Sequence, residues 1–154
     1  MPDHPAVQIE SASGASAEIV EAVARLVGQL SASAPSPDAE QIEQLLASSA
    51  IRLLLARDRD SDGRIVGMLT LALFPIPTGM RAWIEDVVVE HAARGRGVGS
   101  LLTVEALRLA REAGARTVDL TSRPSREAAN RMYVSLGFRR RETNVYRHDE
   151  SAAG

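Results

Sequence analysis

The sequence predicts an α/β (α+β) domain with one mixed, mostly antiparallel sheet and helices on both faces. Residues 83–121 have the pattern strand, long helix, strand, which is a crossover connection, so these two strands are expected to be parallel. The strands at 51–57, 65–74 and 83–90 are joined by short turns, which favour antiparallel hairpins. A length of 154 residues suits one domain, so we expect a single domain over residues 1–154, with residues 1–5 and 148–154 as loose termini.

Apolar periodicity predicts five elements in the first half of the chain. They are a strand at 6–10, helices at 16–30 and 38–47, and strands at 51–57 and 65–74. Ser16 is expected to cap the first helix, and Asp38 is expected in the first turn of the second, where its charge suits the helix dipole. Asp62-Gly63 is the strongest hairpin signal and predicts the turn between the last two strands.

The second half is expected to add the centre of the sheet and two further helices. The expected elements are a strand at 83–90, a helix from Val98 to Ala113, a strand at 116–121, a helix from Ser125 to Leu136, and short strands from Phe138 and at 144–147. Gly114 is expected to end the first of these helices in a left-handed conformation, and Gly137 to end the second. Ser125 is the expected N-cap of the second helix.

The composition excludes several kinds of chemistry. The chain has no cysteine, which excludes a thiol nucleophile, a disulfide framework and thiolate metal sites. All 18 basic residues are arginine, so a Schiff base with a lysine of the enzyme is excluded as well. The three histidines lack metal-ligand spacing, and we therefore expect no metal.

Charge is unevenly distributed along the chain. Residues 1–80 hold 10 acids and 5 arginines, giving −5, and residues 81–154 hold 10 acids and 13 arginines, giving +3, which together make the net charge of −2. A basic half can bind nucleic acid, but this half also contains a turn suited to phosphate, so we expect no nucleic-acid partner. No signal peptide and no apolar run of about 18 residues occurs, which predicts a cytoplasmic protein without a membrane span.

A glycine-rich turn between the Val-rich strand and the long helix is the clearest binding signal. It runs Arg94-Gly95-Arg96-Gly97-Val98-Gly99-Ser100. Glycines allow a tight turn and close approach of the backbone, and the first N–H groups of a helix have no internal partner, so with the arginines they form an anion site. A dinucleotide loop is disfavoured because its third glycine is missing, and a P-loop is excluded because there is no lysine.

Two motifs resemble signatures of the GNAT superfamily of N-acetyltransferases. Arg94-x-x-Gly97-x-Gly99 resembles the loop that binds the pyrophosphate of acetyl-CoA. Residues 128–138, an alanine-rich helix that ends in Tyr-x-x-x-Gly-Phe, resemble the second signature. The resemblance covers residues 83–138 and implies the GNAT fold, with a central sheet of six to seven strands whose parallel pair splays apart.

The resemblance implies an acetyl-CoA site on these elements. The strand backbone would pair with the pantetheine arm like an added strand, and the turn would hold the pyrophosphate. The implied acetyl-CoA-binding residues are Val87, Val88, Val89, Arg94, Gly95, Arg96, Gly97, Val98, Gly99, Ser100 and Asn130. Many members carry an asparagine seven places before the tyrosine, where this chain has Arg126, so Asn130 is expected to take over that contact.

The implied reaction is direct transfer of an acetyl group to a primary amine, which must lose a proton before it attacks. Glu85 and Asp86 are the candidates for the base because carboxylates in an apolar strand are costly to bury without partners, and Glu85 is the expected base. Adjacent Asp86 is the alternative, since members of the family often have a bulge here. Tyr133 is the expected acid that protonates the CoA thiolate. Each of these residues also has a purely structural interpretation, as a bonded carboxylate or a core aromatic.

The sequence does not distinguish a small-molecule amine from a protein amine as the acceptor. Dimers are common in the family, so a homodimer is possible. A non-catalytic acetyl-CoA-binding regulatory module is the alternative function, since it needs the glycine-rich turn but neither Glu85 nor Tyr133. A third hypothesis is an accessory protein that contacts RNA through its basic half.

Overall fold

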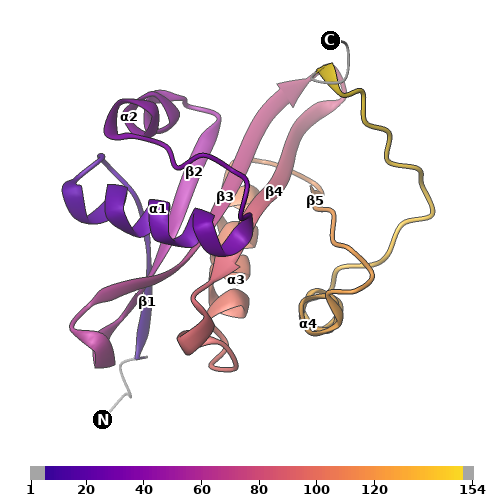
Figure 1. Ribbon diagram of the computed structural model, residues 1–154. Helices are drawn as coiled ribbons and strands as arrows, with labels where there is room; N and C mark the ends of the chain where they lie inside the picture. The colour runs from indigo at the N-terminus through magenta and orange to yellow at the C-terminus, as the bar shows by residue number, and fades with distance from the viewer. Residues whose placement is uncertain (1–5, 151–154) are drawn as a thin grey trace. The chain divides into compact units, whose positions relative to one another are not determined.

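The computed structural model describes residues 6–150, which form two compact units divided after Thr121 (Figure 1). The first unit contains β1 Val7–Ser11, α1 Ala17–Leu30, α2 Ala39–Ala47, β2 Ile51–Asp58, β3 Arg64–Ile76, β4 Gly79–Val89, α3 Val98–Glu112 and β5 Val118–Asp119, with 3₁₀ turns at Arg59–Ser61 and His91–Ala93. The second unit contains α4 Glu127–Ser135. Among residues 6–150 no helix has the length and apolar character that crossing a membrane requires.

The sheet confirms the predicted fold class. Strands β1 to β4 pair consecutively in antiparallel fashion, and β5 joins β4 in parallel. The sheet has five strands rather than six to seven. β5 is shorter than the predicted strand at 116–121, and the strands expected from Phe138 and at 144–147 are absent. Within the described residues, no backbone–backbone hydrogen bond involves residues 139–147, and an extended segment becomes a strand only when its backbone is paired.

Helices cover both faces of the sheet in the first unit. On one face, Leu26 of α1 and Ile42 of α2 join a buried cluster that includes Met68 of β3. Neighbouring Gly67 points to the opposite face, where a Cβ on it would lie 3.2 Å from the side chain of Val98. The missing Cβ therefore lets the start of α3 pack closely on the sheet.

The N-cap of α1 is the predicted residue, whereas the starts of α2 and α4 differ from the prediction. Ser16 caps α1 through its side chain, as predicted. Asp38 is the N-cap of α2 rather than part of its first turn, because its side chain and that of Gln41 form a reciprocal capping box. The N-cap of α4 is Arg126 rather than Ser125, because a hydrogen-bonded turn precedes the helix and ends at Arg126.

Helices α3 and α4 both end at a left-handed glycine. Gly114 has a φ of 84° and Gly137 a φ of 96°. In each case the N–H groups of the glycine and of the next residue return to carbonyls of the last helical turn, which is a Schellman motif. In α4 this motif brings Phe138 against Tyr133, edge-on with ring centroids 5.7 Å apart. The Tyr-x-x-x-Gly-Phe spacing is thus also the spacing that this type of helix ending requires.

Candidate functional site

Strand β4 has a bulge at its two carboxylates. Thr70 of β3 pairs with Glu85, whereas Met68 pairs with Val88, so two residue steps on β3 face three on β4. The extra residue is accommodated at Asp86, whose φ of 50° is left-handed. A non-glycine residue in this conformation is uncommon, and bulges and strained residues occur often at functional sites. The bulge agrees with the expectation from the family resemblance.

The side chain of Glu85 lies on the face of the sheet that α1 and α2 cover. Its partner Thr70 pairs in turn with Leu53, a member of the buried cluster beneath these helices, and directly paired residues share a face. Glu85 is exposed, and its Oε1 accepts a hydrogen bond of 2.8 Å from Nε1 of Trp83. Trp83 therefore orients the carboxylate, while Oε2 has no hydrogen-bond partner in the described part of the chain.

Asp86 is the second carboxylate of the bulge. Although Asp86 is an exposed residue, partial burial of its carboxyl, together with the neighbouring charge of Glu85, raises the pKa of Asp86 above its usual range. A general base works best when its pKa lies near the working pH, so the shift is in the useful direction. The bulge thus places two carboxylates with different environments next to each other.

The edge of β4 that faces β5 is mostly unpaired. The two parallel strands pair at residues 82–83 of β4 and 118–119 of β5, and within residues 6–150 the ladder goes no further. Residues 87–89 lie on the stretch of β4 beyond this pairing, with the side chain of Val88 buried in the core cluster. The predicted splayed pair is therefore present, and it leaves backbone groups that an extended ligand can use.

The glycine-rich turn presents a row of amide groups without acceptors. Gly95 and Gly97 both have a φ of 78°, which glycine adopts without strain. Gly97 is the N-cap of α3 and has no side chain to cap it. Across residues 6–150, no acceptor takes up the amide N–H of any residue from 95 to 100. These amides lie at the positive end of α3 and can therefore bind an anion.

The two arginines of this turn have different partners. Nε of Arg94 donates to the carbonyl of Val89 at 3.2 Å, and no described carboxylate pairs with its guanidinium. Arg96 forms a bidentate ion pair with Asp58 at the end of β2, with N–O distances of 2.6 and 3.2 Å. The charge of Arg96 is therefore already balanced, whereas the charge of Arg94 is available to a bound anion.

Asp58 is a residue whose importance the sequence does not reveal. It stands in a run of acids and turn formers that predicts an exposed hairpin tip, yet it is only 1% exposed. The usable signal is its place as the last residue of an apolar strand, two and three residues before Asp60 and Ser61. Its carboxylate accepts the N–H of Asp60 and the hydroxyl of Ser61, both at 3.1 Å.

Tyr133 and Asn130 lie on α4, in the second unit. Tyr133 is 6% exposed and packs edge-on against Phe138. Burial raises the pKa of the Tyr133 hydroxyl, an effect that the charge of Arg126 opposes, so the hydroxyl is protonated at neutral pH. Nδ2 of Asn130 donates to the carbonyl of Arg123 at 3.0 Å and holds the turn before the helix.

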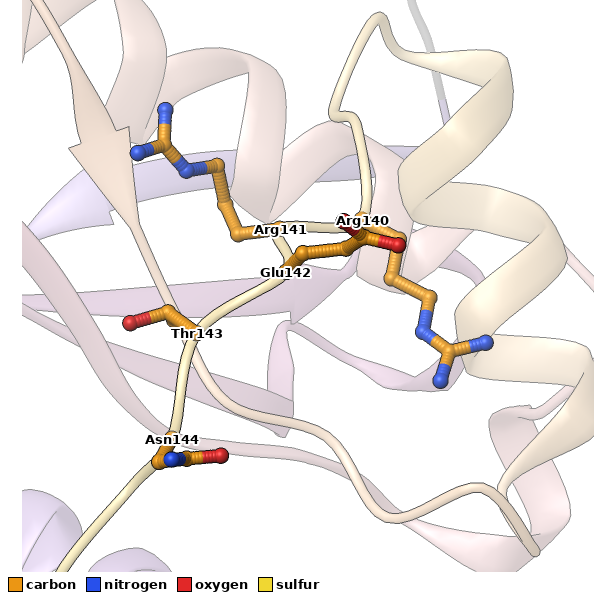
Figure 2. A pocket seen from close by; sticks show the side chains of 5 residues that line it. All are labelled: Arg140, Arg141, Glu142, Thr143 and Asn144. Carbon is orange, nitrogen blue, oxygen red and sulfur yellow. The ribbon is translucent and has the colours of Figure 1, made fainter.

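An open hollow of about 670 Å³ lies farther along the second unit. Its lining consists of five consecutive residues, Arg140, Arg141, Glu142, Thr143 and Asn144. Figure 2 shows the side chains of Arg140 and Arg141 pointing to opposite sides of the segment, so they do not converge on one ligand. Within residues 6–150, no three histidine, aspartate or glutamate side chains gather closely enough to hold a metal ion.

Comparison with known proteins assigns the chain to a family. The model of the acetyltransferase (GNAT) family matches residues 22–138. The chain belongs to this family. Its membership confirms the resemblance seen in the sequence.

Individual relatives agree with this assignment. Mycothiol acetyltransferase of Thermomonospora curvata is 33% identical over 127 residues, which cover 79% of this chain and 41% of the relative. Glucosamine 6-phosphate N-acetyltransferase of Trypanosoma brucei brucei is 41% identical over 86 residues, which cover 54% of this chain and 56% of the relative. The matched region thus spans about half of each relative's length. A putative acetyltransferase from Agrobacterium tumefaciens shares the fold, with a TM-score of 0.79, 24% identity and coverage of 92% of this chain and 99% of its own.

Proposed function

We propose that the protein transfers the acetyl group of acetyl-CoA to a primary amine by direct attack. The observation that carries the proposal is the row of unpaired amides at residues 95–100, which follows closely on the unpaired edge of β4. A diphosphate needs convergent N–H donors, and the amides of a pantetheine arm need an open strand edge. The chain offers both within one stretch of its first unit.

The residues present fit acetyl-CoA as the donor substrate. The amides of 95–100 and the unbalanced charge of Arg94 would hold the diphosphate, and the backbone of residues 87–89 would pair with the pantetheine arm. Oδ1 of Asn130 would be the group left for the ligand, since its Nδ2 already donates within the second unit. When bound, acetyl-CoA supplies an activated acetyl thioester.

The Glu85–Asp86 pair would supply the general base. An amine is protonated at neutral pH, and a positioned carboxylate that removes its proton accelerates the reaction by about 10²–10⁴-fold. Glu85 is the first candidate because Trp83 orients its carboxylate on the face covered by α1 and α2. Asp86 is the alternative because its pKa is raised, and two adjacent carboxylates titrate as a pair.

Tyr133 would donate the proton that the departing thiolate needs. Its raised pKa keeps the phenol protonated at neutral pH, which a general acid requires. Its packing against Phe138 fixes the ring and is compatible with this role. Tyr133→Phe should therefore slow turnover while leaving the affinity for CoA unchanged. Unchanged turnover, with the chemical step shown to be rate-limiting, would leave Tyr133 with the packing role alone.

The test is an acetylation assay with acetyl-CoA and a panel of amines, following thiol release and product mass. The panel begins with glucosamine 6-phosphate, which the name of the Trypanosoma brucei brucei relative contains, and extends to simple amines and a peptide N-terminus. We expect acetyl-CoA-dependent acetylation that Glu85→Gln or Asp86→Asn reduces. Absence of CoA binding in calorimetry would contradict the proposal, and binding without turnover across the panel would favour a regulatory module.

A further inference from the structure

We propose that the ion pair between Asp58 and Arg96 positions the glycine-rich turn, so that its amides are set for the donor's diphosphate before the donor binds. This inference rests on the proposed function. It assigns Arg96 a positioning role, in place of the direct contact that the sequence predicts, and it adds Asp58 to the residues on which donor binding depends.

The Asp58 end of this pair is fixed because its carboxylate is fully used. The carboxylate accepts two hydrogen bonds from Arg96, one from the backbone N–H of Asp60 and one from the hydroxyl of Ser61. An ionised carboxylate offers about four acceptor positions, so none is left over. Asp58 is also only 1% exposed, so the side chain has little room to move.

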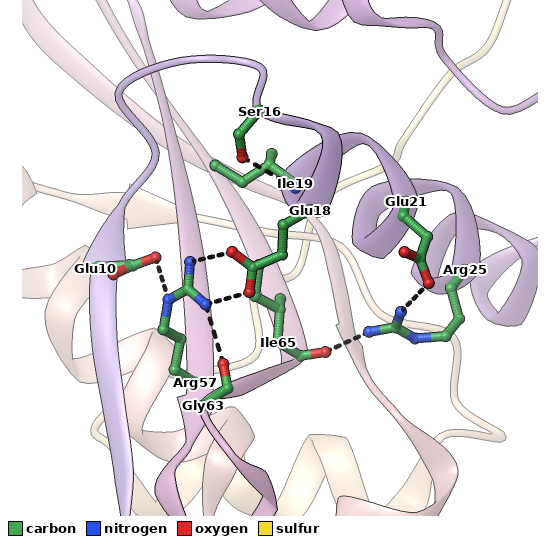
Figure 3. A network of polar contacts seen from close by, with 9 residues as sticks. All are labelled: Glu10, Ser16, Glu18, Ile19, Glu21, Arg25, Arg57, Gly63 and Ile65. Carbon is green, nitrogen blue, oxygen red and sulfur yellow. Dashed lines mark hydrogen bonds and ion pairs between the residues drawn. The ribbon is translucent and has the colours of Figure 1, made fainter.

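The β2–β3 turn that carries Asp58 is itself tied to its surroundings. Figure 3 shows Arg57 bridging three segments: its guanidinium binds Glu10 of β1, Glu18 of α1 and the carbonyl of Gly63. The bonds to Glu10 and Gly63 are 2.7 and 3.0 Å long. Asp58 is therefore a rigid point to which a flexible loop can be attached.

The loop end of the pair needs such an attachment. Arg96 stands between Gly95 and Gly97, which are both left-handed and would have space for a Cβ, so neither is held by packing. Glycines carry the largest conformational freedom of any residue, and a loop that samples many conformations binds more weakly. The positive charge of Arg96 is neutralised by Asp58. Arg96 therefore contributes to donor binding by fixing the conformation of the loop rather than by its charge.

Asp58→Asn should change the affinity for CoA in opposite directions, depending on whether the ion pair acts by positioning the loop or by neutralising Arg96. Asparagine keeps the size of the side chain but removes the charge that pairs bidentately with Arg96, so that Asp60, 3.6 Å away, is the one acid still paired with Arg96 among the described residues. If charge dominated, the freed Arg96 would make CoA bind more tightly. If positioning dominates, the loop loosens and we expect the Kd for CoA in calorimetry to rise by about tenfold or more, with full binding stoichiometry.

Arg96→Lys tests the other residue of the ion pair, and Asp62→Asn is the control. Lysine keeps the charge but cannot form the bidentate fork, so Arg96→Lys should weaken CoA binding like Asp58→Asn, and the double variant should be no weaker than either one. Asp62→Asn removes a charge from the same turn without touching Arg96 and should bind like the wild type.

The outcomes distinguish this inference from the proposed function. Weaker CoA binding by both Asp58→Asn and Arg96→Lys, at full stoichiometry, supports the positioning role. Equal or tighter binding by Asp58→Asn, or wild-type binding by Arg96→Lys, overturns it while leaving the proposed function intact. If the wild-type chain itself does not bind CoA, the proposed function fails, and this inference fails with it.

Discussion

Two turns of the first unit each contain two left-handed residues but differ in their hydrogen bonding. The β2–β3 turn contains left-handed Asp62 and Gly63, and the turn before α3 contains two left-handed glycines. In the first turn, the carboxylate and carbonyl of Asp58 accept N–H groups of the turn itself. In the second, the amides of 95–100 find no acceptor within residues 6–150. Left-handed residues thus close a hairpin in one turn and accompany free N–H donors in the other.

The largest difference in CoA affinity is expected between Gly97→Val, in the turn before α3, and the corresponding variant in the β2–β3 turn. Valine is strained at a φ of 78°, and its side chain would crowd the amides around the diphosphate. We expect CoA to bind about a hundredfold more weakly, measured by calorimetry. Gly63→Val is the matched control, because its φ is 74° and a Cβ meets no atom within 4 Å at either position. Equal loss of affinity in both variants would contradict the distinction.

Arg94→Ala should have the next largest effect. Its guanidinium carries the unbalanced charge of the α3 turn, so its loss should weaken CoA binding by about tenfold. The loss should shrink as salt is added, because screening weakens the wild-type interaction. Arg59→Ala in the β2–β3 turn removes an arginine that binds Gln8 and should leave the affinity unchanged. A salt-independent loss would mean that Arg94 acts through structure.

Asp58→Asn should lower stability in a way that depends on pH. Hydrogen bonding from Arg96 holds the pKa of Asp58 below its usual range. The carboxylate therefore contributes stability above its ordinary pKa of about 4 and loses it as the pH falls through the lowered folded value. Thermal melts should show a lower Tm for Asp58→Asn at pH 7 and a narrowing gap in acid. A gap that stays constant down to pH 2 would argue against this linkage.

Asp86→Asn should have a smaller effect on stability than Asp58→Asn, and it should raise the stability rather than lower it. The pKa of Asp86 is raised, so folding favours its protonated form, and the wild type loses stability as the pH rises through that value. Asparagine also tolerates the left-handed conformation well. We expect a Tm about 1 °C higher than that of the wild type at pH 7, with no gain near pH 3. No such gain should appear for Asp62→Asn, and a lower Tm for Asp86→Asn would contradict the assignment.

The sequence predicts the elements whose side chains alone set the structure. Helices α1 and α3 have periodic apolar faces, and the capping role of Ser16 and the left-handed Gly114 follow from local chemistry. Features that depend on distant partners are harder to predict. The register shift opposite Thr70 and the buried pair of Asp58 with Arg96 form between segments far apart in the chain.

The C-terminal segment is another case in which the residue types do not determine the structure. Residues 144–147 have residue types that suit a strand, but a strand also needs a paired backbone, and within residues 122–150 these residues have no backbone partner. β5 is short for the related reason that its ladder with β4 stops after two residue pairs. Residue pattern alone therefore predicts strand character, while strand length depends on the neighbour.

Titration of the ¹⁵N-labelled protein with CoA shows whether the amides of residues 95–100 bind the donor's diphosphate. The amide resonances of residues 95–100 should shift on binding and exchange more slowly with solvent, while those of residues 59–63 should not. Binding of CoA that leaves residues 95–100 unperturbed would contradict the account.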